Sequence, residues 1–426
     1  MTWGIVFRVR QTLRGSLWVL PLVGGILGVL LGTLDIQLEQ NIHLPPYWQY
    51  SESTASTVLA TIVGATAALT GFVVTVTVLV VQMATGTFSA RYMRLWYRDR
   101  MLKAELAILV GTLTFSFALL RRVESNFVPN IGVTISGLLI ATSLLVFMLF
   151  LDRYLHRLRP VAVAALVARA GRKAFRQAVQ ASAEPDHPDL HATPYHAPNP
   201  PTHVVRSRRA GSIQAIDGRG LVRFARQHNC LLVLPHVVGD FIPEGATLIE
   251  IHGGPNIADN QLRGMVALGV ERTIEQDPAF AIRIMVDVAI RALSAAINDP
   301  TTAVQVIDHL GDTLRLIGTT DLDGLPEQAG QPQVGHVIIH TRSWADFLAL
   351  GVTEIREYGA TAIQVNRRLR AMLEELREEV VPQHQPAIDD ELARLDASVA
   401  RGFSDSPDLD RAGTADRQGI GGPDER

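Results

Sequence analysis

The side chains best suited to chemistry lie between Glu271 and Leu310, in a stretch that contains two Asp-Pro pairs. Asp277 precedes Pro278, and Asp299 precedes Pro300. An acidic N-cap residue followed by proline at the first helical position is a strong signal for the start of a helix. The residues of this stretch that could form a ligand-binding or structural polar cluster are Arg272, Asp277, Asp287, Arg291, Asn298, Asp299, Thr301 and Thr302.

Two interpretations of this cluster are open. In the first, two capped helices are joined by a tight turn, and Asp287 pairs with Arg283 or Arg291, each four residues away. In the second, the free backbone N–H groups of Thr301 and Thr302 bind an anion at a helix N-terminus, where Arg291 adds positive charge. The spacing of the acids matches no calcium or zinc loop, so we expect no metal site.

The sequence contains no recognisable catalytic motif. Asp287 and Asp299 are the acids that would serve in an enzyme, but no nucleophile or acid–base pair accompanies them. The turn GDFIPEG at 239–245 is typical of small β-modules of the lipoyl type, yet the lysine that would carry the cofactor is absent. Cys230, the single cysteine, precedes an apolar run and is expected in a buried strand. We therefore expect neither an enzyme nor a cofactor.

Four long apolar runs precede this region and predict transmembrane helices. They are Ser16–Leu34, Thr57–Ala84, Leu106–Leu120 and Ile131–Leu151. A helix needs about 20 residues to cross a hydrocarbon core about 30 Å thick. The third run reaches this length only with Met101–Glu105, where we expect Lys103 and Glu105 to lie at the membrane interface. No ionisable residue lies near the centre of a run, which counts against a charge-coupled transporter.

The basic residues around these runs predict the orientation in the membrane. Arginine and lysine gather before the first run, between the second and the third, and after the fourth, whereas Ile36–Thr54 contains none. Arg121 and Arg122 oppose this pattern but are outnumbered. We expect a multi-pass protein of the bacterial cytoplasmic (inner) membrane with both termini in the cytoplasm.

Small residues recur on two of the runs and predict close helix contacts. In the first run the small residues are Gly24, Gly28 and Gly32, at intervals of four. In the second run a small-to-polar stripe includes Gly64, Ala68, Gly71, Thr75 and Gln82. This stripe is either a helix-packing seam, in which threonine hydroxyls bond to backbone carbonyls, or the lining of a pore shared by several copies.

The rest of the chain predicts a cytoplasmic mixed α/β domain, with a small β-module followed by a helical half. The expected organisation is a four-helix transmembrane domain at 1–160, an amphipathic juxtamembrane helix at 161–180, a flexible linker at 181–203, the α/β domain at 204–400 and a disordered tail at 401–426. The juxtamembrane helix is rich in arginine, which suits either anionic lipid headgroups or a solvated face.

The block at 271–310, ERTIEQDPAFAIRIMVDVAIRALSAAINDPTTAVQVIDHL, resembles the signature of a bacterial family of predicted membrane proteins, domain of unknown function 2254. The likeness runs from about Leu17 to about Glu379 and includes the four apolar runs, the GDFIPEG turn and Phe88-Ser89-Ala90-Arg91. Where the family usually has proline before the arginine, this chain has Ala90. Where the family reads Ser-Pro-Gly before Ile-Asn-Asp-Pro, this chain has Ala295 and Ala296 in place of the proline and glycine. The resemblance implies a location and an architecture, but it supplies no reaction.

The formal net charge of −3 argues against nucleic-acid binding, which needs a concentrated basic face. We expect a homo-oligomer in the lipid bilayer that acts as a passive channel or transport-related assembly gated by its cytoplasmic domain. The alternative is a membrane-anchored ligand sensor or scaffold, in which the spans only anchor the chain. The sequence does not identify the permeant species or the cytosolic ligand.

Overall fold

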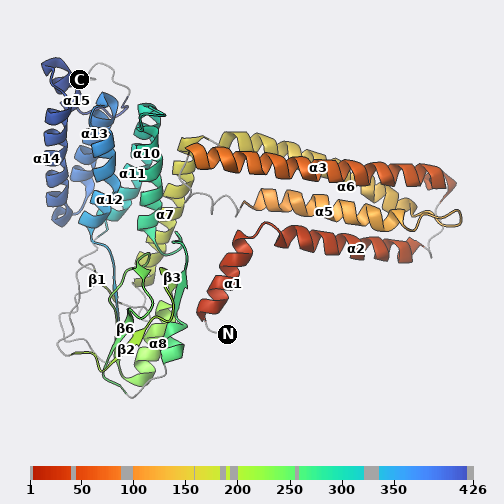
Figure 1. The fold of residues 1–426 in the computed structure, drawn as a ribbon, viewed down its shortest axis with the longest axis horizontal. Coiled ribbons are helices and arrows are strands. Elements are labelled where there is room, and N and C mark those ends of the chain that lie inside the picture. Colours follow the sequence, from red (N-terminus) through yellow and green to blue (C-terminus); the bar gives the residue numbers. More distant parts are fainter. Residues whose placement is uncertain are drawn as a thin grey trace. The chain divides into compact units, whose positions relative to one another are not determined.

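The computed structural model describes residues 3–39, 45–87, 99–157, 159–182, 189–191, 200–254, 259–320 and 335–419. The chain forms two compact units, whose elements are drawn in Figure 1. We call Gln11–Arg159 the membrane unit, and Met1–Arg10 with Pro160–Arg426 the α/β unit. Helix α1 (Trp3–Gly15) runs from the second unit into the first. The basic residues at 91–98 and the resembling turn at 88–91 lie outside the described residues.

Four helices among the described residues are long and apolar enough to cross a membrane, matching the four predicted spans. They are α2 (Val19–Glu39), α3 (Glu52–Thr87), α5 (Arg100–Leu120) and α6 (Asn130–Arg157), with a short 3-10 helix, η1 (Pro46–Trp48), before α3. Helix α5 includes the extra turn that the third run needed. Its N-cap is Asp99, whose carboxylate accepts a hydrogen bond from the Met101 backbone N–H at 2.7 Å.

Helix α5 is the central helix of the membrane unit. It packs against α2, α3 and α6, and half of its most apolar stretch is buried, compared with 17%, 22% and 28% in α2, α3 and α6. The outer faces of the other helices carry exposed apolar side chains such as Leu30, Leu79 and Met148. Such faces suit contact with lipid tails.

Glycines of α2 allow this helix to approach α5 closely. Gly24, Gly28 and Gly32 all face α5. A Cβ atom at Gly28 would collide with the Gly111 carbonyl oxygen and with the Thr114 hydroxyl. The Thr114 hydroxyl also lies 3.0 Å from the Gly25 carbonyl oxygen, across the contact. Because lipid gives helices no hydrophobic reason to associate, van der Waals contact and interhelical hydrogen bonds of this kind hold α2 against α5.

The β-module of the α/β unit contains two small sheets. The larger has the order β1 (Asp189–His191), β8 (Val337–His340), β4 (Leu231–Leu234), β6 (Thr247–His252) and β2 (His203–Arg206). Strand β8 runs parallel to β1 and β4, and the other pairs are antiparallel. The smaller, antiparallel sheet has the order β5 (Phe241–Ile242), β3 (Gly211–Ile216) and β7 (Val266–Gly269). Phe224, Leu232 and Ile249 belong to the buried core of this module.

Two helices accompany these strands, α8 (Gly218–His228) and α9 (Asp259–Arg263). The helical half that follows consists of α10 (Pro278–Ala292), α11 (Pro300–Gly318), α12 (Trp344–Tyr358), α13 (Ile363–Glu379), η3 (Pro382–His384), α14 (Gln385–Gly402) and α15 (Ser406–Gly413). Helix α7 (Pro160–Ser182) packs against α10 and α11. Its apolar face is buried there, and Arg172 pairs with Asp312 of α11 at 2.5 Å. The predicted juxtamembrane helix is thus part of the helical half.

The structure differs from the sequence prediction at two predicted segments. Within the expected flexible linker at 181–203, Asp189–His191 forms β1 and pairs with β8. Within the expected disordered tail at 401–426, Ser406–Gly413 forms α15, and the Asp416 backbone N–H donates to the Arg367 carbonyl oxygen at 3.2 Å. Both segments are polar and lack periodicity. Their order comes from partners distant in the sequence, which local patterns cannot indicate.

The α2–α5 contact generates a test of packing. We expect Gly28→Val to lower the stability of the membrane unit, because the added methyl groups would push α2 away from Gly111 and Thr114. Overpacking of a close contact costs about 1–3 kcal/mol. The measurement is the thermal unfolding midpoint of the full-length protein in detergent. Gly137→Val is the matched control, since a Cβ atom at Gly137 of α6 meets no atom within 4 Å. Equal losses in both variants would contradict the role of the contact.

Candidate functional site

Buried polar side chains occupy one face of α5 in the membrane unit. Glu105, Thr112 and Ser116 follow one another at intervals of seven and four, which places them on one side of the helix. This side is opposite the one that carries Gly111 and Thr114 against α2, so the row faces away from α2. We call these three residues the α5 polar row. It extends about 16 Å along the helix.

Members of the α5 polar row are fully enclosed yet lack partners. Glu105, Thr112 and Ser116 are exposed by 1% or less. Their side-chain oxygens accept or donate no hydrogen bond within the described part of the chain. Buried polar groups in proteins are nearly always hydrogen-bonded, and in a membrane helix an unpaired ionisable group is a functional candidate by default.

Glu105 is the member whose burial is most unfavourable. Its side chain has no exposed surface, and neither carboxyl oxygen has a partner among the described residues. A bare carboxylate in this position, with no cation beside it, is strongly disfavoured. Lys103 is buried too, and its ammonium group donates to the Arg14 carbonyl oxygen at 2.5 Å. Near the start of α5, where we expect the membrane interface, both side chains are buried, which the sequence pattern did not indicate.

Other helices add polar groups to the inside of the membrane unit. Thr66 and Thr77 of α3 are buried, and their hydroxyls donate to the carbonyl oxygens four residues earlier, at 2.6 and 2.7 Å. Ser136 of α6 is buried, with no partner among the described residues. On α2, Asp35 Oδ2 is buried near Gly132 of α6 and also has no described partner. Acidic side chains therefore lie near both ends of the α5 polar row.

The small-to-polar stripe of α3 points away from the other helices of its own chain. Its residues Gly64, Ala68, Gly71, Thr75 and Gln82 are all exposed. A Cβ atom at Gly64 or Gly71 would meet nothing within 4 Å, in contrast to one at Gly28 of α2. The Thr75 hydroxyl donates to the Gly71 carbonyl oxygen at 2.9 Å. Of the two predicted stripes, the glycine repeat of α2 packs against a neighbouring helix among the described residues. The α3 stripe lies on the surface of the chain.

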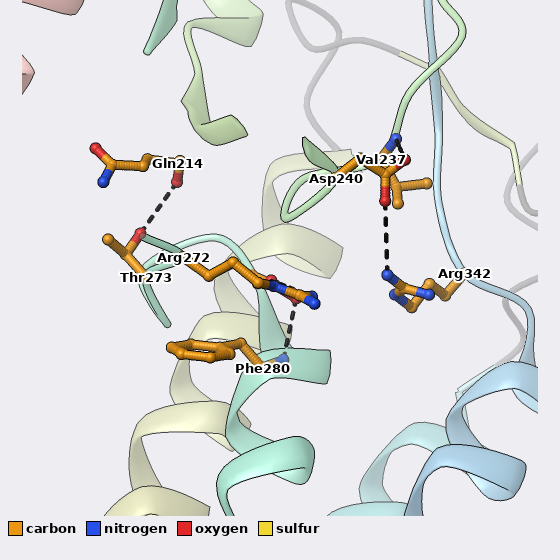
Figure 2. A network of polar contacts seen from close by, with 8 residues as sticks. Gln214, Val237, Asp240, Arg272, Thr273, Phe280 and Arg342 are labelled. Carbon is orange, nitrogen blue, oxygen red and sulfur yellow. Dashed lines mark hydrogen bonds and ion pairs between the residues drawn. The ribbon is translucent and has the colours of Figure 1, made fainter. Parts of the chain in front are cut away.

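A second polar cluster lies in the α/β unit, where the β-module meets α10 (Figure 2). Asp277, the N-cap of α10, is 2% exposed and accepts hydrogen bonds from Nε and Nη2 of Arg272 at 3.0 and 2.7 Å. Its other oxygen accepts from the Phe280 backbone N–H at 3.1 Å. Arg272 also lies over the Phe280 ring, 5.4 Å from its centroid. Burial raises the pKa of the Asp277 carboxyl, and the Arg272 charge opposes that rise.

The GDFIPEG turn and Arg342 complete this cluster. Gly239 has a φ of +100°, and a Cβ atom there would lie 2.5 Å from Nη2 of Arg272. Only glycine combines this conformation with so close an approach. The Asp240 carboxylate accepts from the Val237 backbone N–H at 3.1 Å and faces Arg342 at 3.8 Å, as Figure 2 shows. We call Gly239, Asp240, Arg272, Asp277 and Arg342 the junction network.

Asp287 and Arg291 do not join the junction network. Asp287 pairs with Arg283 at 2.8 Å, and Arg283 also pairs with Glu354 of α12. These two acids raise the pKa of Arg283, with the Glu354 hydrogen bond contributing most. Arg291 is exposed near the C-terminal end of α10. The arrangement ties α10 to α12.

The remaining predicted residues form a capped turn at the far end of α10. The 15 residues of α10, about 22 Å of helix, separate Asp277 from Asn298 and Asp299. Asn298 has a φ of +49°, and Asp299 accepts hydrogen bonds from the backbone N–H and hydroxyl of Thr302 at 3.0 and 2.6 Å. Thr301 is exposed. The Asp299 carboxylate thus occupies the helix N-terminus that an anion would need.

Sequence reasoning found Arg272 and Asp277 of the junction network but did not assign Asp240 or Arg342 to it. No local pattern connects Arg342 to Asp240, since about a hundred residues separate them. The α5 polar row was within reach, because 105, 112 and 116 repeat with a helical period. Within the described residues no group of three or more His, Cys, Asp or Glu side chains could hold a metal ion.

The junction network generates a prediction about stability and pH. Arg272→Gln leaves the Asp277 carboxylate buried without its ion-pair partner, so we expect the free energy of unfolding to fall by about 3–5 kcal/mol. Without Arg272, burial raises the pKa of Asp277 further, although the Phe280 backbone hydrogen bond and the charge of Arg342 still oppose the rise. An acid whose folded-state pKa is raised supports stability at low pH and loses it as pH rises toward that pKa.

The loss should therefore be larger at pH 8 than at pH 5, in denaturant unfolding of the full-length protein. The double variant Arg272→Gln/Asp277→Asn is the matched control, because it leaves no buried charge unpaired and should regain part of the stability at pH 8. A loss in Arg272→Gln that is equal at both pH values would contradict this account.

Comparison with known proteins agrees with a membrane location. The family model described as "Predicted membrane protein (DUF2254)" matches residues 14–375. Uncharacterized proteins of Mycobacterium tuberculosis (strain CDC 1551 / Oshkosh) and Mycobacterium bovis (strain ATCC BAA-935 / AF2122/97) are each 28% identical over 422 residues, 94% of this chain and 79% of theirs. No solved structure matches. With four membrane-length apolar helices and a match over most of its length, the chain belongs to the DUF2254 family of predicted membrane proteins.

Proposed function

We propose that the protein is a transport-related membrane assembly that passes protons or another small cation, with Glu105 as the group that binds the cation in transit. The observation that carries this proposal is the complete burial of Glu105 with both carboxyl oxygens unpartnered among the described residues. Such a group is expensive to keep inside a helix bundle, and membrane proteins that keep one commonly use it for ion or proton movement.

The polar side chains near Glu105 support a path for a proton or cation along α5, because Glu105 is not the only buried polar group there. Thr112 and Ser116 continue from it along the same face of α5, and Ser136 of α6 is buried as well. Asp35, near the other end of α5, offers a second carboxyl group. The steps along α5, about 6–10 Å, exceed a hydrogen bond, so a proton would need water between the side chains.

Transport without an energy source fits these residues best. The sequence contains no nucleotide-binding motif, and a buried carboxyl group can exchange a proton or cation with either side under a gradient alone. The chain would then act as a passive conductor, and the α/β unit would regulate it. The lack of an ionisable residue near the centre of the apolar runs also counts against an active, charge-coupled transporter more than against a passive conductor.

The direct test is flux through liposomes that contain the purified full-length protein. We expect an imposed pH or cation gradient to dissipate faster than in empty liposomes, as followed by an enclosed pH-sensitive dye or a cation indicator. Glu105→Gln should abolish most of the flux, because the amide keeps the size of the side chain but neither takes up a proton nor carries charge.

Glu124→Gln provides the matched control, since Glu124 is an exposed residue of the same unit and the chemical change is identical. Its flux should equal that of the unmodified protein. Absence of flux in the unmodified protein, or equal flux in the Glu105→Gln variant, would contradict the proposal.

The same assembly is proposed to be a homo-oligomer that associates through α3. Gly64, Gly71 and Thr75 are exposed on a helix that otherwise presents large apolar side chains to lipid, such as Phe72 and Leu79. Small residues on a membrane helix permit close approach of a second helix. No partner chain is needed for the α5 polar row, which lies within one copy.

Disulfide cross-linking tests this association. In a Cys230→Ala background, Gly71→Cys should form covalent dimers in membranes under mild oxidation, whereas Ala65→Cys, exposed but about 120° around α3 from Gly71, should form few. Cys230 is the natural cysteine and is buried, so its removal leaves the new thiol as the reactive group. Equal cross-linking at both positions would argue against a specific α3 contact.

The alternative function is a membrane-anchored ligand sensor or scaffold. The junction network favours it, because Asp240, Arg272 and Arg342 bring three segments distant in the sequence to one point. A ligand that separated Arg342 from Asp240 would loosen the β-module from the helical half. In this alternative, replacement of the membrane helices by unrelated ones would leave cellular activity intact.

A further inference from the structure

The α/β unit contains a small cavity whose walls carry arginine side chains and no acids. Its volume is about 220 Å³. The arginines that line it are Arg8, Arg208, Arg209 and Arg263. Leu248 and Leu268 form part of an apolar floor, and no Asp or Glu is among the described residues that line the cavity. A compact anion is the ligand that such walls favour.

The N-terminal helix forms one wall of this cavity through a specific contact. The Gly4 backbone N–H of α1 donates to the Gly264 carbonyl oxygen at 2.7 Å. A Cβ atom at Gly4 would lie 2.9 Å from that oxygen, so the close approach depends on glycine at this position. Arg8 follows one turn later, and its Nε donates to the Gly4 carbonyl oxygen at 3.2 Å. The contact places the Arg8 guanidinium at the cavity.

The β-module holds the opposite wall in place. The Ser207 hydroxyl donates to the Arg209 carbonyl oxygen at 2.6 Å and shapes the turn between β2 and β3. Nη2 of Arg209 donates to the Leu268 carbonyl oxygen of β7 at 2.6 Å. Nε of Arg263 donates to the Arg206 carbonyl oxygen at 2.7 Å. These bonds fix the guanidinium groups of Arg209 and Arg263 before any ligand arrives, which lowers the entropy that binding must overcome.

Most of the positive charge at this cavity is not neutralised by the protein. Arg263 pairs with Asp259. Arg8, Arg208 and Arg209 have no carboxylate partner in the described part of the chain. Burial, together with the positive charge of Arg8, lowers the pKa of Arg209, so these two guanidinium groups repel each other. An anion between them would relieve this repulsion.

We propose that this cavity binds the phosphate group of an anionic ligand, held by Arg8, Arg208 and Arg209. Guanidinium groups bind phosphate through paired, charge-assisted hydrogen bonds. The volume is below the roughly 300–1,000 Å³ of pockets for drug-sized ligands, so it suits a phosphate-bearing headgroup. The phosphate belongs either to an anionic phospholipid or to a small soluble compound. The inference does not depend on transport by the membrane unit.

Two binding measurements on the full-length protein distinguish these sources. In the first, inorganic pyrophosphate is titrated into delipidated protein in detergent by calorimetry. In the second, protein from nanodiscs of phosphatidylcholine and phosphatidylglycerol is examined by native mass spectrometry for retained phosphatidylglycerol. The variant Arg8→Gln/Arg208→Gln removes two charges, neither of which pairs with a described carboxylate, so the fold should persist. Its unfolding midpoint is checked, and Arg208→Gln alone serves if the midpoint falls.

We expect the cavity variant to weaken binding at least about tenfold, as the loss of charge-assisted hydrogen bonds implies. Arg223→Gln on α8 removes one arginine charge at an exposed position away from the cavity and should leave the binding of both probes unchanged. If the cavity variant loses pyrophosphate binding but retains phosphatidylglycerol like the unmodified protein, the ligand is a soluble compound. If the cavity variant loses phosphatidylglycerol retention, the ligand is a lipid headgroup. The proposal is overturned if the unmodified protein binds neither probe, or if Arg223→Gln weakens binding as much as the cavity variant.

Discussion

The close contact of α2 with α5 determines how the membrane unit is built. Because Gly24, Gly28 and Gly32 lack side chains, the backbone of α2 approaches closely along one side of α5. The opposite side of α5, which carries Glu105, then has to lie where α3 and α6 pack. A bulkier α2 would leave α5 nearer the edge of the unit, where its polar groups could reach headgroups or water. The unusual burial of Glu105 is thus a consequence of three absent side chains on another helix.

In the α/β unit, the Asp277 carboxyl group stabilises two parts of the structure at once. Asp277 starts α10 by accepting from the Phe280 backbone N–H, and it holds Arg272, which follows the last strand of the smaller sheet. The start of the helical half and the end of the β-module therefore depend on the same side chain. Gly239 adds a steric condition, because only a residue without Cβ fits beside the pair. This shared dependence gives the junction network its rigidity.

Sequence reasoning predicted those features that local patterns encode. The four apolar helices, the Asp-Pro helix starts and the pairing of Asp287 with an arginine all follow from spacing along one element. It missed β1 and α15, whose order depends on distant partners. It did not predict the burial of Glu105, because composition gives the distance of a residue from a helix end but not which neighbours surround it. The arginine cavity escaped notice for the same reason, since α1 and the β-module are far apart in the sequence.

The threonines of α3 bear on the sign of charge that the membrane unit tolerates. Thr66 and Thr77 each have a single hydroxyl proton, and each donates it to a carbonyl oxygen of its own helix. Only oxygen lone pairs remain for anything that comes alongside. At these two positions α3 therefore offers acceptors and no donors, whereas the hydroxyls of Thr112 and Ser116 on α5 keep both, because they have no hydrogen-bond partner among the described residues.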